Sequence, residues 1–189
     1  MGSANKLLLK YNDHTIIEEV LSQMSNSKVD DILVVTGFER DRIEAVLSNQ
    51  LTERIRFVYN GFYYRGRAES IKSAVRQISE NVEAALFMVA DKPGITSSLM
   101  DRAIFKFEKE RPDILYVETP AGRGHPIIFS KMLFDELLSM DGDCVGDELI
   151  GGHRDSTIRL KDKTEQIDVD NEDDYCLLMN SIAGRKRKM

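Results

Sequence analysis

The sequence lacks the long apolar run that a membrane-spanning helix needs. No stretch of the 189 residues approaches the roughly 20 apolar residues of a span, and the first residues show no signal-peptide pattern. Cysteines are also few: Cys144 and Cys176 lie far apart without CxxC spacing, so neither a zinc site nor a redox pair is indicated. We therefore expect a cytoplasmic protein without a membrane partner.

The sequence also has fewer basic than acidic residues. The 26 Lys and Arg residues are outnumbered by 32 Asp and Glu residues, which gives a net charge of −6. A protein that binds nucleic acid along its surface is usually basic, so this balance argues against a nucleic-acid partner. No Ser-His-Asp or Cys-His arrangement stands out either, which disfavours hydrolysis through a covalent intermediate.

The chain is long enough for one substantial core and too short for two comfortable domains, so we expect a single domain over residues 1–189. Apolar periodicity predicts strands that alternate with helices through short connections, a pattern typical of an α/β fold with a mostly parallel sheet. The expected strands are 31–36, 55–59, 84–90, 114–118, 125–130, 157–160 and 165–169. The expected helices are 15–25, 40–47, 68–79, 96–109, 131–140, 148–150 and 171–182.

The segment AALFMVADKP at residues 84–93 is the centre of this interpretation. Its apolar run does not alternate, which indicates a strand buried on both faces in the middle of a parallel sheet. Asp91 then lies at the carboxyl end of that strand, where open α/β sheets bind their ligands. The alternative is a surface aspartate that begins a turn, because Asp-Lys-Pro is also good turn chemistry.

Two further carboxylates follow the last expected strand. Asp168 and Asp170 are two residues apart, so in a strand they share one face. Together with Asp91 they suit a hard cation such as Mg²⁺, which usually takes one or two carboxylates plus phosphate oxygens. The competing interpretation is that both carboxylates stabilise the start of the last helix, and the sequence leaves these two roles about even.

Basic residues near glycines are candidates for phosphate binding. Lys6 follows a segment that contains Gly2 and can act as a point cation toward phosphate. The Arg-Gly-Arg loop at 65–67 precedes a helix start that could receive an anion. His125 could titrate or donate to a ligand, although a structural histidine before Pro126 is about as plausible.

The order of these motifs resembles the MobA-like nucleotidyltransferases, and within them the molybdenum-cofactor cytidylyltransferase (MocA-like) branch. The similarity covers nearly the whole chain. The matching segments are MGSANKLLL (1–9), VTG (35–37), NG (60–61) with Gly66 and Ser70, ADKP (90–93), GHP (124–126), GD (142–143) and DVDNEDDY (168–175).

The resemblance implies a Rossmann-like three-layer sandwich of the nucleotide-diphospho-sugar transferase type. The implied reaction transfers CMP from CTP, or NMP from another NTP, to a molybdopterin-type cofactor with release of pyrophosphate, in support of molybdenum hydroxylase maturation. The implied partners are the nucleotide triphosphate, the phosphorylated pterin and the hydroxylase apoenzyme. Mg²⁺, or Mn²⁺ in its place, is the implied metal. In such transfers positioning and charge neutralisation do most of the work, so no protein nucleophile is needed.

The same resemblance assigns roles to individual residues. Lys6 and Asp91 are the implied catalytic residues, with Lys6 neutralising the triphosphate. The implied metal ligands are Asp91, Asp168 and Asp170. The implied nucleotide- and acceptor-binding residues are Gly2, Lys6, Gly37, Asn60, Gly66, Ser70 and His125, of which Gly37, Asn60 and Ser70 line the base and ribose and His125 faces the acceptor.

The sequence departs from the family pattern at its start and beside Asp91. The first strand and the glycine-rich half of the phosphate loop are missing, so we expect a sheet without that strand. Lys92 replaces the Gln of Gly-Asp-Gln-Pro and adds a cation next to Asp91.

Two alternatives to a molybdenum-cofactor cytidylyltransferase stay open. They are a sugar-1-phosphate nucleotidyltransferase and a catalytically inactive nucleotide-binding domain. The base preference, the acceptor and the oligomeric state are left open.

Overall fold

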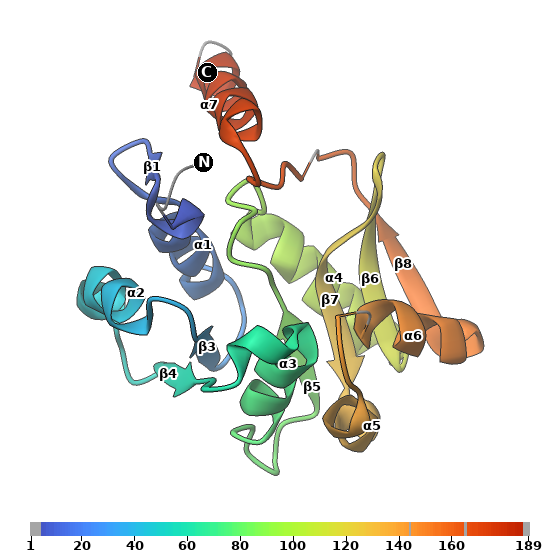
Figure 1. The fold of residues 1–189 in the computed structure, drawn as a ribbon. Helices are drawn as coiled ribbons and strands as arrows, with labels where there is room; N and C mark the ends of the chain where they lie inside the picture. The colour runs from blue at the N-terminus through green and yellow to red at the C-terminus, as the bar shows by residue number, and fades with distance from the viewer. Residues whose placement is uncertain (1–4, 144, 165, 187–189) are drawn as a thin grey trace.

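The structure is a computed structural model that describes residues 5–143, 145–164 and 166–186 (Figure 1). It confirms the expected α/β class with a mixed sheet flanked by helices. The strands are β1 (Lys10–Tyr11), β2 (His14–Thr15), β3 (Ile32–Thr36), β4 (Ile55–Tyr59), β5 (Ala84–Phe87), β6 (Ile114–Thr119), β7 (Gly122–Ser130) and β8 (Thr157–Lys161). The helices are α1 (Ile16–Ser25), α2 (Arg40–Leu47), α3 (Arg67–Val75), α4 (Ser97–Glu110), α5 (Phe134–Ser139), α6 (Val145–Gly152) and α7 (Glu172–Lys186).

The strands form separate hydrogen-bonded ladders. Strand β3 pairs in parallel with β4, and a four-stranded ladder follows the order β5-β7-β6-β8. In that ladder β7 runs antiparallel to both β5 and β6, whereas β6 and β8 are parallel. In the part of the chain that the structure describes, no strand pairs with the second edge of β3 or of β5. The two ladders are therefore not joined by main-chain hydrogen bonds.

Strand β5 differs from the sequence expectation in length and in position. It ends at Phe87 rather than at residue 90, and it lies at the edge of the four-stranded ladder, antiparallel to β7. The register explains the early end, because Phe87 lies opposite Ile127 and the next residue would face Pro126. A proline has no N–H to donate, so the ladder cannot continue in the same way.

The segment expected as a strand over 165–169 has no strand pairing in its described part, 166–169. Its polar groups are used elsewhere: the side chain of Gln166 hydrogen-bonds the main chain of His125. Val169 is fully buried with Tyr11, Ile16 and Leu178. The hydrogen bonds of Gln166 and the packing of Val169 thus help to hold a segment that no ladder holds.

Local signals in the sequence account for several helix ends. Thr15 begins α1 with a capping box, because its side chain accepts from the Glu18 N–H while the Glu18 carboxylate accepts from the Thr15 N–H. Asn171 accepts from the Asp174 N–H and caps α7. Helix α3 ends at Val75, four residues before the expected end.

Helices cover both faces of the four-stranded ladder. Ile127 and Phe129 of β7 pack with α3, α5 and α6, whereas Ile128 packs with Ala103 of α4. The change of face at each residue is the two-residue period of a strand. Helices α1 and α2 pack on the β3–β4 pair, and Ala90 packs against the same cluster. None of the described helices is long and apolar enough to cross a bilayer.

Candidate functional site

Three carboxylates from distant parts of the sequence meet at one place. Asp91 follows β5, and Asp168 and Asp170 lie between β8 and α7. Each offers an oxygen within 4.8 Å of the oxygens of the other two. The expected meeting of these side chains is therefore seen in the structure, and their role as metal ligands stays a prediction.

Lys6 lies among these carboxylates. Its Nζ atom is 2.7 Å from Asp91 Oδ2, 2.7 Å from Asp170 Oδ1 and 3.8 Å from Asp168 Oδ1. The lysine begins a short 3₁₀ turn, Lys6–Leu8, which is capped by the side chain of Asn5. A second cation, Lys92, has its Nζ atom 3.6 Å from Asp168 Oδ2. The site thus combines three acidic and two basic groups.

The charges of the cluster change the pKa values of its members. Burial alone would raise the pKa of Asp91, but the hydrogen bond and charge of Lys6 outweigh it and hold this pKa below its usual value. Burial and the neighbouring charge of Asp91 raise the pKa of Asp168. Burial would lower the pKa of Lys6, yet its hydrogen bonds to Asp170 and Asp91 raise it overall. Asp91 and Lys6 are therefore an ionised pair near neutral pH.

The donor set fits a divalent cation. Mg²⁺ and similar hard ions take oxygen ligands, commonly one or two carboxylates with the remainder supplied by water and phosphate. Asp170 is the most accessible of the three, with 68 % of its side chain exposed, so its oxygens can reach an incoming ligand. Asp91, Asp168 and Asp170 are the residues that would hold such an ion, and Lys6 would lie beside it.

Asn60, Ser70 and Gly37 were expected to line the base and ribose. Buried Asn60 donates from Nδ2 to Ser70 Oγ at 3.0 Å, and its Oδ1 accepts the Phe62 N–H at 2.9 Å. A Cβ on Gly37 would lie 2.6 Å from Tyr63 Cβ, so the glycine is needed for close packing. The structure gives these residues packing and turn-forming roles, and their contact with a nucleotide stays a prediction.

The helix start at 65–67 is arranged differently from the anion-binding expectation. The Arg67 N–H donates to Asp143 Oδ1 at 2.8 Å, and the Ala68 N–H donates to the Gly142 carbonyl at 2.9 Å. Gly66 has φ +111°, a conformation that favours glycine, and a Cβ there would lie 3.0 Å from the Gly142 carbonyl oxygen. Two of the N–H groups that an anion would use are thus already bonded within the chain.

His125 is partly buried beside the end of β5. Its Nδ1 is 3.3 Å from the Phe87 carbonyl oxygen, at the end of β5. Burial lowers the pKa of His125, and the positive charges of Lys92 and Arg67 lower it further against the opposing effects of Phe87 and Asp91. The imidazole is therefore neutral near pH 7. Gln166, which holds the main chain of His125, carried no signal in the sequence, and Gly2 lies outside the described residues.

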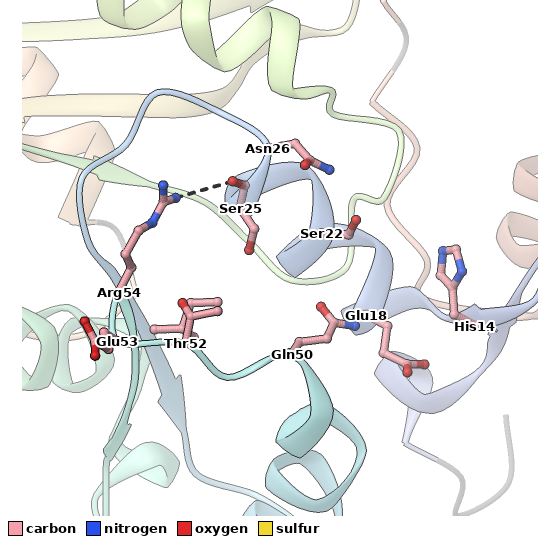
Figure 2. A pocket seen from close by; sticks show the side chains of 10 residues that line it. His14, Glu18, Ser22, Ser25, Asn26, Gln50, Thr52, Glu53 and Arg54 are labelled. Carbon is pink, nitrogen blue, oxygen red and sulfur yellow. Dashed lines mark hydrogen bonds between the residues drawn. The ribbon is translucent and has the colours of Figure 1, made fainter.

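A surface hollow of about 680 Å³ lies away from the carboxylates, between α1 and the segment before β4 (Figure 2). Arg54 crosses one end of it and donates to the Ser25 carbonyl at 3.3 Å. Its lining includes none of the residues that the sequence singled out. We therefore place the candidate site at the carboxylates.

The chain belongs to the MobA-like NTP transferase domain family, whose model matches residues 1–157. The matched range ends before Asp168 and Asp170, which the motif resemblance implied and which the structure places beside Asp91. The more specific cytidylyltransferase branch is not distinguished by this match.

One curated protein is similar to part of the chain at low sequence identity. The chain is 24 % identical over 133 residues to the bifunctional protein GlmU of Staphylococcus carnosus, covering 69 % of this chain and 27 % of that protein. It therefore spans about a quarter of the length of that curated relative.

Two solved structures illustrate the shared fold. Rv0371c of Mycobacterium tuberculosis H37Rv, solved in complex with manganese, superposes with a TM-score of 0.78 at 22 % identity, covering 94 % of this chain and 93 % of that one. The 4-diphosphocytidyl-2C-methyl-D-erythritol synthase of Anaerococcus prevotii superposes with a TM-score of 0.76 at 15 % identity, covering 96 % and 93 %.

Proposed function

We propose that this protein transfers a nucleotide from CTP, or from another NTP, to a molybdopterin-type cofactor and releases pyrophosphate. The observation that carries the proposal is the meeting of Asp91, Asp168 and Asp170 around Lys6. An acidic cluster of this kind suits a divalent ion, and the adjacent lysine suits a triphosphate. The molybdenum hydroxylase apoenzyme would receive the product.

The residues of the site would act by binding and orientation. A bound divalent ion, Mg²⁺ or Mn²⁺, supplies positive charge that offsets the triphosphate. Asp91, Asp168 and Asp170 would hold that ion, and Lys6 would stabilise charge on the departing phosphates. A phosphate oxygen of the acceptor forms the new bond to the α-phosphorus, and the bond to the leaving pyrophosphate oxygen breaks. Positioning and charge neutralisation suffice for such a transfer.

The supporting comparisons concern the class of reaction and the metal. One similar structure is a protein named as a diphosphocytidyl synthase, and another holds manganese. They favour a cytidylyltransferase with a divalent ion. A sugar-1-phosphate nucleotidyltransferase of the same fold is the second candidate.

Pyrophosphate release tests the proposal. We expect turnover with CTP, a divalent ion and a molybdopterin-type acceptor, and at least a tenfold loss in Asp91→Asn because a metal-binding charge is removed. Exposed Asp155, outside the cluster, provides the matched control Asp155→Asn, which should retain activity. Turnover with UTP or GTP and a sugar phosphate, but not with CTP and the pterin, would favour the second candidate. Release that is unaffected by Asp91→Asn would refute the assignment of the site.

A further inference from the structure

Gln166 forms a two-point hydrogen-bonded pair with the main chain of a single residue. The His125 N–H donates to Gln166 Oε1 at 2.8 Å, and Gln166 Nε2 donates to the His125 carbonyl at 2.5 Å. One side-chain amide thus satisfies both polar groups of a partly buried peptide segment, as a neighbouring strand would. Such reciprocal pairing fixes both the distance and the orientation of the two segments.

The main chain of Gly124 approaches this pair closely. A Cβ on Gly124 would lie 2.6 Å from Gln166 Oε1 and 2.9 Å from Thr119 Cγ2. The amide is therefore enclosed between β7 and the end of β6, and the glycine at 124 is what admits it. A side chain of the same length without the amide would leave the His125 N–H and carbonyl unpaired, which is costly in a partly buried place.

The pair links the two segments that carry the carboxylates. Gln166 lies two residues before Asp168, and the imidazole of His125 contacts the Phe87 carbonyl at the end of β5, four residues before Asp91. The described segment 166–169 has no strand pairing of its own. Gln166 therefore supplies the hydrogen bonds that tie this segment to β7, in addition to the ion pairs of Lys6 and Lys92 with Asp168.

We propose that Gln166 is a positioning residue that sets the separation of Asp168 and Asp170 from Asp91, and thereby the affinity of the site for a divalent cation. The inference rests on the metal-binding part of the proposed function. Groups that orient metal ligands without touching the ion commonly contribute about 10- to 100-fold to metal affinity. The structure assigns that role to Gln166 through the two hydrogen bonds and not through any contact with the ion.

Binding of Mn²⁺ without nucleotide, followed by electron paramagnetic resonance, tests the inference on the full chain. We expect Gln166→Met to weaken Mn²⁺ binding by about 10-fold or more, because it keeps the side-chain length and removes both hydrogen bonds. The exposed Gln77→Met is the matched control and should bind like the wild type.

Steady-state kinetics provide the second readout. If Gln166 is a positioning residue, Gln166→Met should raise the KM for the metal and largely retain kcat at saturating metal. A general loss of folding would instead lower the active fraction, and with it kcat alone. Gly124→Ala, which pushes against the amide from β7, should raise the metal KM in the same direction.

The outcomes separate this inference from the proposed function. If folded Gln166→Met binds Mn²⁺ as tightly as the wild type does, the positioning role is overturned, whatever the enzyme activity. Weakened Mn²⁺ binding in Gln166→Met, together with a wild type that releases no pyrophosphate, would uphold the positioning role and reject the proposed reaction. A wild type that binds no Mn²⁺ would overturn both.

Discussion

Lys6 offsets the charge of carboxylates that would otherwise repel one another. It contacts Asp91 and Asp170 at 2.7 Å, and about a third of its side chain is exposed. Because solvent screens such a partly exposed pair, its net contribution to stability is modest, up to about 1 kcal/mol. The main effect of Lys6 is therefore to neutralise charge within the carboxylate cluster, and its contribution to the stability of the fold is small.

Removing this charge should destabilise the protein in a way that a divalent ion reverses. We expect Lys6→Met to lower the free energy of unfolding by up to about 1 kcal/mol at low ionic strength, because three carboxylates lose a counter-charge. Added Mn²⁺ should reduce the difference from the wild type, measured as a shift in melting temperature. Substitution of the exposed Lys163 in Lys163→Met should show neither effect. If added Mn²⁺ does not reduce the loss of melting temperature in Lys6→Met, the metal assignment is contradicted.

His125 should make the stability of the protein depend on pH. Its pKa in the folded chain is lowered by burial, whereas in the unfolded chain it is about 6.5. Well above pH 6.5 the imidazole is neutral in both states and contributes no pH dependence. Below it, the unfolded chain binds a proton that the folded chain resists, so the free energy of unfolding falls until the folded pKa is reached.

Urea unfolding between pH 7.5 and 5 measures this effect. The slope due to one such group is at most about 1.4 kcal/mol per pH unit. His125→Gln should remove that part of the slope, and His153→Gln should retain it. Equal slopes in the wild type and in His125→Gln would show that the buried imidazole does not resist protonation.

At the scale of single elements, the capping box of α1 offers a clear test. Thr15→Ala removes the side-chain acceptor for the Glu18 N–H, so the free energy of unfolding should fall by about 1 kcal/mol. Thr15→Ser keeps the acceptor, so its free energy of unfolding should fall by less. Chemical denaturation gives both values, and an unaffected Thr15→Ala chain would mean that water replaces the cap at no cost.

Elements with local signals were predictable from the sequence. Helix α2 and strand β4 have the bounds that periodicity predicted, and α1 begins one residue after its predicted start. The end of β5 was not predictable, because it depends on Pro126, which lies opposite in the ladder but far away in the sequence. The segment 166–169 kept the apolar pattern of a strand, yet the Gln166 side chain pairs in its place.

The candidate site was predictable to a similar degree. Lys6, Asp91, Asp168 and Asp170 were recognisable because each lies in a motif with a known order along the chain. Gln166 was not recognisable, since a lone glutamine has no preferred partner until the fold brings His125 to it. For the same reason the sequence did not predict that Asp143 would occupy the start of α3.

For the whole molecule, the packing of α4 against the four-stranded ladder sets much of the stability. Leu115 is fully buried with Ala103 of α4 and Ile128 of β7. Leu115→Ala should lower the free energy of unfolding by about 2–5 kcal/mol, because it removes buried methyl groups and leaves a cavity. Leu51, whose side chain is largely exposed, serves as the control in Leu51→Ala and should cost far less in the same denaturation experiment.

The second edges of β3 and β5 have a consequence for assembly. Among the described strands, neither edge has a hydrogen-bonded neighbour, and both strands carry mostly apolar side chains. An edge of this kind acts as a template for another extended chain. Any such chain that reached both edges, from the same molecule or from a different one, would fuse two ladders into one continuous sheet.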